Sequence, residues 1–102
     1  MRKKIKRGQK VEVGFTSRER ELVLGHTFTS PELTTRLRRA QLVDGKHVVR
    51  YTLDDLDELL GFVAAEANHS KDREIRRELD ALYARLCGEM ESYDDGLWQR
   101  PF

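Results

Sequence analysis

The sequence predicts an α+β fold: a small three-stranded antiparallel sheet, two short helices and a C-terminal antiparallel helical hairpin. Three observations indicate this. Apolar and polar residues alternate near the N-terminus, an Asp-Gly pair lies between two β-type segments, and two long amphipathic stripes follow Thr52. Read along the chain, the order of elements is β-α-α-β-β-α-α.

The first strand is expected at residues 9–15, because Val11, Val13 and Phe15 alternate with polar or small residues. Thr16 and Glu19 then have the spacing of a capping box. In that motif the Thr side chain accepts a bond from the backbone N–H of Glu19, and the Glu side chain bonds back. A helix is therefore expected at about 17–25.

A short linker, residues 26–30, comes next, and its apolar Phe28 is expected to turn inward. Ser30 followed by Pro31 is a typical helix start, since Ser caps the N-terminus and Pro suits the first helical position. The second helix is expected at 31–38.

A hairpin is expected around Asp44 and Gly45, because this pair readily adopts the positive φ angles of a type I′ turn. The flanking segments carry β-branched and aromatic residues. They predict strands near 39–43 and 46–51.

Two long helices complete the pattern. Thr52 and Asp55 form a variant capping box, and Ser70 is the expected start of the second helix, which runs to about residue 91. The first apolar face consists of Leu53, Leu56, Leu59, Leu60, Val63, Ala64 and Ala67, and the second of Ile75, Leu79, Leu82, Tyr83, Leu86 and Met90. The short break predicts that the two helices fold back on each other.

The length of 102 residues suits one domain, which we expect at 9–92. Residues 1–8 read as a basic flexible arm, and residues 93–102 as an irregular tail. The chain has one cysteine, Cys87, which excludes an internal disulfide.

The chain has no apolar run long enough to span a membrane, and no apolar segment follows the basic N-terminus as in a secretory signal. The sequence therefore predicts a soluble, cytoplasmic protein that has no membrane partner.

Charge is divided unevenly between the halves. Residues 1–51 hold 13 Lys or Arg and 5 Asp or Glu, whereas residues 52–102 hold 6 and 13. Such a split favours either a nucleic-acid surface on the basic half or attraction between the halves, within one chain or between two copies.

The segment from about 17 to 51 resembles a winged helix-turn-helix in the order of its elements. The resemblance implies that the second helix enters the DNA major groove and the hairpin touches the backbone. The candidate nucleic-acid-binding residues are Arg36, Arg38, Arg39, Lys46 and Arg50.

No catalytic or metal motif stands out, and the sequence predicts neither an enzyme nor a bound cofactor. Glu66 and His69 have a spacing used in metal-binding bundles, but the motif occurs once, so His69 is expected to shield the last carbonyls of its helix. Cys87 adjoins the apolar stripe and is expected to be a small buried hydrophobe.

The C-terminal tail contains Leu97, Trp98 and Phe102, which either cover the core or insert into a partner. The leading hypothesis is a small non-enzymatic interaction or regulatory domain that binds a protein partner or a second copy of itself. The alternative is a small nucleic-acid-binding protein.

Overall fold

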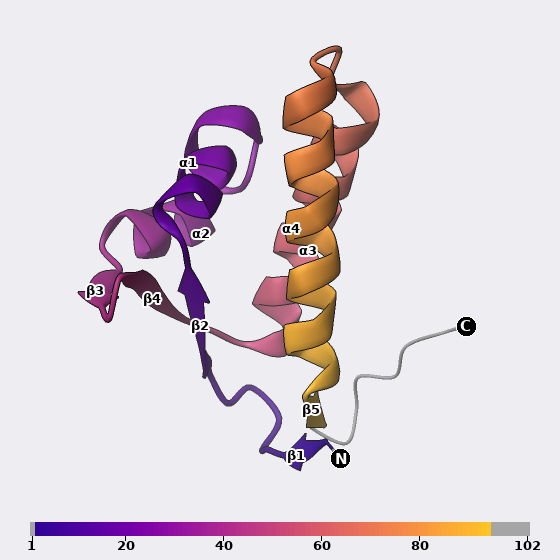
Figure 1. Ribbon diagram of the computed structural model, residues 1–102. Coiled ribbons are helices and arrows are strands. Elements are labelled where there is room, and N and C mark those ends of the chain that lie inside the picture. Colours follow the sequence, from indigo (N-terminus) through magenta and orange to yellow (C-terminus); the bar gives the residue numbers. More distant parts are fainter. Residues whose placement is uncertain (1, 95–102) are drawn as a thin grey trace.

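The computed structural model describes residues 2–94 (Figure 1). Its elements, in chain order, are β1 (Lys3–Lys4), β2 (Val11–Phe15), α1 (Ser17–His26), α2 (Pro31–Arg38), β3 (Gln41–Val43), β4 (Lys46–Tyr51), α3 (Leu53–His69), α4 (Arg73–Glu91) and β5 (Tyr93–Asp94).

The main sheet has the strand order β2-β4-β3, and both pairings are antiparallel. The central strand β4 lies between the strand that precedes the two short helices and the strand that follows them. The predicted α+β class, the three-stranded antiparallel sheet and the C-terminal packed helix pair are confirmed.

The core lies between the sheet, the two short helices and the α3–α4 pair. One face of the sheet contributes the alternating residues of β2 and β4, which are buried while their neighbours face outward. The α3 and α4 helices run side by side along most of their lengths (Figure 1). The largest fully buried side chains are Phe15, Leu22, Leu33, Leu37, Tyr51, Leu53, Leu56, Leu59, Leu79, Leu82, Leu86 and Met90.

The basic N-terminal segment contributes a short strand, which the sequence analysis did not anticipate. β1 pairs in parallel with β5, and Ile5 donates its backbone N–H to the carbonyl of Asp94 at 2.9 Å. Ile5 also packs against the core. The two ends of the described chain are thus joined by backbone hydrogen bonds (Figure 1).

Two predicted helix caps differ from the structure. Ser70 ends α3 rather than starting α4, and the side chain of Asp72 caps α4 by accepting from the backbone N–H groups of Glu74 and Ile75. Ser30 holds the N-cap position of α2 without making a capping bond. An Asp carboxylate is a stronger acceptor for helix N–H groups than a hydroxyl, which explains the shift to Asp72.

Phe28 was expected to turn inward, and this was wrong, because its side chain is 88% exposed. The neighbouring threonines determine its direction. Thr27 donates its hydroxyl to the carbonyl of Val23 at 2.8 Å, and the hydroxyls of Thr27 and Thr29 bond to each other. Because consecutive side chains of an extended backbone point to opposite sides, the inward threonines leave Phe28 facing solvent.

The Asp-Gly turn is as predicted, with φ of 51° at Asp44 and 80° at Gly45. We expect Gly45→Ala to lower the free energy of unfolding by about 1–2 kcal/mol, because a Cβ is disfavoured in left-handed backbone. Gly61→Ala is the matched control. Gly61 lies in α3 with open space around it, so the same substitution should stabilise by up to about 1 kcal/mol. Urea denaturation of both variants measures this, and equal shifts of the same sign would contradict it.

Candidate functional site

Two arginines are held by the carboxylates that cap helices. Arg85 on α4 donates to both carboxylate oxygens of Glu19 at 2.6 and 3.0 Å, while Glu19 also accepts from the backbone N–H of Thr16 in the capping box of α1. Arg85 donates further to the carbonyl of Gly14 at 3.0 Å and lies over the ring of Phe15. One guanidinium therefore joins α4 to the end of β2 and the start of α1.

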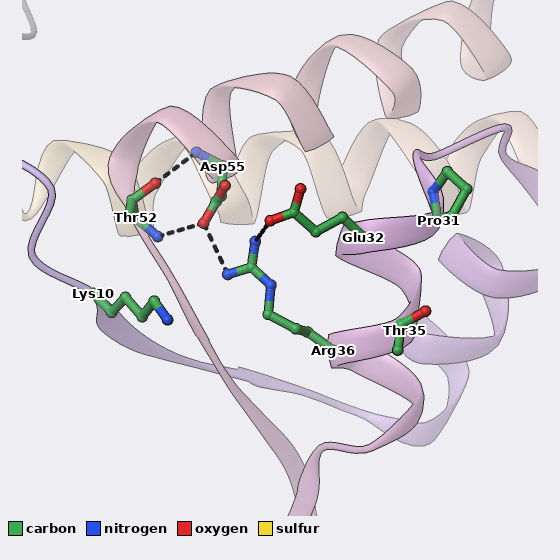
Figure 2. Close-up of a pocket in the computed structure, with 7 residues that line it drawn as sticks. All are labelled: Lys10, Pro31, Glu32, Thr35, Arg36, Thr52 and Asp55. Atoms are coloured by element: carbon green, nitrogen blue, oxygen red, sulfur yellow. Dashed lines mark hydrogen bonds and ion pairs between the residues drawn. The ribbon is translucent and has the colours of Figure 1, made fainter.

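Arg36 on α2 has an equivalent set of partners, which Figure 2 shows in part. It donates at 3.0 Å to Asp55, whose carboxylate also accepts from the backbone N–H of Thr52 in the capping box of α3. It donates to the carbonyl of Arg50 at 3.2 Å and lies 5.1 Å from the ring centre of Tyr51. Arg36 thus joins α2 to the end of β4 and the start of α3.

The two clusters share a local sequence pattern that the sequence analysis missed. Residues 13–19 read Val-Gly-Phe-Thr-Ser-Arg-Glu, and residues 49–55 read Val-Arg-Tyr-Thr-Leu-Asp-Asp. Both contain Val, any residue, an aromatic residue and Thr, followed three residues later by a carboxylate. The signal was visible as two capping boxes, but the arginines that complete the clusters come from other parts of the chain.

The cluster around Arg36 shifts two pKa values. Burial alone would raise the pKa of Asp55, but hydrogen bonds from Arg36 and from the Thr52 backbone outweigh it, so the pKa lies below its usual value. Burial also raises the pKa of Tyr51 to about 12, although Arg36 opposes this. The Tyr51 hydroxyl donates to the carbonyl of Leu33 at 2.7 Å.

An open cleft of about 660 Å³ lies beside this cluster, between the start of α2 and the start of α3 (Figure 2). Its charged groups are largely used within the protein, because Arg36 also pairs with Glu32 at 3.3 Å. Lys10 is the one charged lining residue with no ion pair within the described chain. The cleft therefore offers little unsatisfied charge to a ligand.

The five candidate nucleic-acid-binding cations lie in different environments. Arg36 is ion-paired with Asp55 in the internal cluster. Arg50 on β4 is the register partner of Glu12 on the neighbouring strand β2. Lys46 runs its aliphatic stem over Gly14 on the outer face of the sheet. Arg38 and Arg39 are exposed at the end of α2, with no acidic partner among residues 2–94.

A second depression, of about 420 Å³, lies between the α1–α2 linker and the C-terminal half of α3. We call it the Phe28 hollow, and its lining residues are Phe28, Phe62, Ala65, Glu66 and His69. Phe28 stands at its edge with almost its whole ring exposed, and Phe62 is half-buried on the α3 side. Two aromatic rings from separate elements thus border one open, mainly apolar space.

The polar lining residues of the hollow are Glu66 and His69. The Nδ1 of His69 lies 2.7 Å from the carbonyl of Ala65, and since a carbonyl can only accept, Nδ1 carries the hydrogen. This contact also confirms that His69 shields a carbonyl near the end of its helix. The half-buried carboxylate of Glu66 has no cationic partner within the described part of the chain.

The other features considered in the sequence are the C-terminal apolar residues, groups of metal-ligating side chains, membrane-spanning helices and Cys87. Leu97, Trp98 and Phe102 lie outside the described residues. Among residues 2–94, no three His, Cys, Asp or Glu side chains are grouped as metal ligands, and no helix is both long and apolar enough to cross a membrane. Cys87 is half-buried and packs against the core.

Comparison with known proteins gives no relative. No family model, no curated protein and no solved structure matches this chain. Its functional interpretation therefore depends on the geometry described above.

We expect Asp55→Asn to lower the free energy of unfolding at pH 7 by roughly 1–3 kcal/mol, because Arg36 loses its charged partner. The pKa of Asp55 is depressed in the folded protein, so its contribution is present above the unfolded pKa and lost as the pH falls. The difference between wild type and variant should therefore shrink below about pH 4. Denaturation at several pH values tests this, and a constant difference down to pH 2 would contradict it.

Proposed function

We propose that this protein is a non-enzymatic interaction domain that binds a protein partner through the Phe28 hollow. The exposure of Phe28 carries the proposal. A ring that is 88% exposed beside a mainly apolar depression offers area that a partner can bury. Aromatic side chains of this kind supply much of the binding energy in protein interfaces.

The rigidity of the linker supports the proposal. Thr27 and Thr29 are anchored by hydrogen bonds on both sides of Phe28, so the backbone that presents the ring is already ordered. A partner that covers a pre-ordered aromatic ring loses less conformational entropy on binding. A single exposed apolar residue is common on protein surfaces, and it is the adjoining hollow that distinguishes Phe28.

Nucleic-acid binding is a second candidate, favoured by one observation. The α1–α2 pair is followed by the β3–β4 hairpin, and β2 pairs with β4 in the same sheet, so the strand pairing as well as the element order resembles a winged helix-turn-helix. Exposed Arg38, Arg39 and Lys46 lie near the end of α2 and on the hairpin. We rank this second because Arg36 is used internally and Arg50 faces Glu12.

The leading proposal is tested by placing the photo-crosslinking residue p-benzoyl-phenylalanine at position 28 and at position 83 in the native cells. Tyr83 is an exposed aromatic residue on α4 that does not line the hollow. We expect a discrete protein adduct from position 28 and none from position 83. Phe28→Ala should change the free energy of unfolding by less than about 0.5 kcal/mol, since the exposed ring makes few contacts with the rest of the protein. Absence of a specific adduct at position 28 would contradict the proposal.

The second candidate is tested by a salt titration of binding to labelled duplex DNA, followed by fluorescence anisotropy. The triple variant Arg38→Ala, Arg39→Ala and Lys46→Ala is compared with Lys71→Ala, Arg73→Ala and Arg77→Ala, which removes the same charge from α4 and the loop before it. If the winged arrangement binds DNA, the first variant alone should flatten the log–log slope, by about 0.9 for each phosphate that is no longer neutralised. Equal effects of both variants would indicate attraction without a defined site.

A further inference from the structure

We infer that the Phe28 hollow takes a cationic side chain, Lys or Arg, from a basic segment of a partner protein, with Glu66 as its counter-ion. The inference rests on the proposed function and names the chemistry of the partner at that same site. The charge of α3, the acceptor character of the hollow and the two aromatic rings support it.

The charge of α3 favours a basic partner. The helix carries five carboxylates and no Lys or Arg between Leu53 and His69, and four carboxylates remain besides Asp55, which is paired with Arg36. Glu58, Phe62 and Glu66 follow one another at intervals of four, so an aromatic ring lies between two carboxylates on one side of the helix. The next cation along the chain is Lys71, beyond the end of α3. An approaching segment therefore meets a predominantly negative helix.

The chemistry inside the hollow favours a donor. The carboxylate of Glu66 accepts hydrogen bonds, and no described residue supplies a cation to it. A half-buried carboxylate without a partner is partly desolvated, so an incoming ammonium or guanidinium group would regain favourable interactions there.

The rings of Phe28 and Phe62 complete the site. The faces of aromatic rings attract cations, and the aliphatic stems of Lys and Arg can cover apolar surface while the charged end reaches a carboxylate. A volume of about 420 Å³ accommodates one such side chain with neighbouring apolar groups. An acidic or purely apolar segment would leave Glu66 repelled or unpaired.

A foreign segment fits the hollow better than this chain's own basic N-terminus. Part of that basic region, Lys3–Lys4, is already held by its backbone pairing with β5. A second copy would have to break this pairing to present those residues to the hollow in extended form. A partner with its own exposed Lys or Arg has no such cost.

The test is selection of a phage-displayed library of random 12-residue peptides on the full chain, with counter-selection on Phe28→Ala. We expect enriched peptides to carry Arg or Lys next to an apolar residue. The strongest binder, synthesised with a fluorescent label, should lose at least tenfold in affinity on Phe28→Ala and on Glu66→Gln. Asp57→Asn, an exposed carboxylate of α3 outside the hollow, and Leu42→Ala, an exposed residue of β3, should change affinity less than twofold.

A second peptide, in which norleucine replaces the cation, keeps the apolar stem and removes the charge. It should bind the wild-type protein more weakly than the original peptide does, and the difference between the two peptides should be smaller on Glu66→Gln, where only the attraction of the cation to the rings remains. If enriched peptides need Phe28 but carry no cation, or ignore Glu66→Gln, the inference is wrong and the proposed function stands. If no peptide is enriched over Phe28→Ala, both are contradicted. If light scattering shows a dimer that Phe28→Ala dissociates, a second copy occupies the hollow and the inference is overturned.

Discussion

The carboxylates of Glu19 and Asp55 each cap a helix and hold an arginine from elsewhere in the chain. Each arginine also binds the backbone of the preceding strand and covers the aromatic ring at its end. This arrangement fixes the angle at which α1 leaves β2 and α3 leaves β4. The positions of α2 and α4 follow, because they carry the two arginines. The sheet, the short helices and the helical pair are thus joined at two equivalent corners.

The two corner contacts join the halves of the chain in opposite senses, since Arg85 of the acidic half pairs with Glu19 of the basic half. Arg36 belongs to the basic half and pairs with Asp55 of the acidic half, and Arg18 pairs with Glu78 at 2.7 Å in the same sense. Two ion pairs thus join a cation of the basic half to a carboxylate of the acidic half. The remaining charged side chains lie on two separate surfaces. Cations lie at the end of α2 and on the hairpin, and carboxylates lie along α3.

The Phe28 hollow illustrates how polar contacts can expose an apolar residue. The threonines on either side of Phe28 use their hydroxyls to complete the end of α1, and the ring is left outside as a consequence. Exposure alone says little about function. The hollow adds a second ring, Phe62, and the carboxylate of Glu66, which has no cationic partner among residues 2–94, so apolar area and negative charge lie together.

Most of the elements could be predicted from local patterns in the sequence, although β1 and β5 could not. Alternation predicted β2, the capping boxes predicted the starts of α1 and α3, and Asp44–Gly45 predicted the turn, all from residues within a few positions of one another. Three features depend on tertiary packing: which arginines form ion pairs inside the protein, the direction of the Phe28 side chain, and the pairing of β1 with β5. The partners of Arg85 at the corner, Glu19 and Gly14, lie 66 and 71 positions away along the chain. No local pattern encodes such a contact, because only the packing of α4 against α1 and β2 brings those charges together.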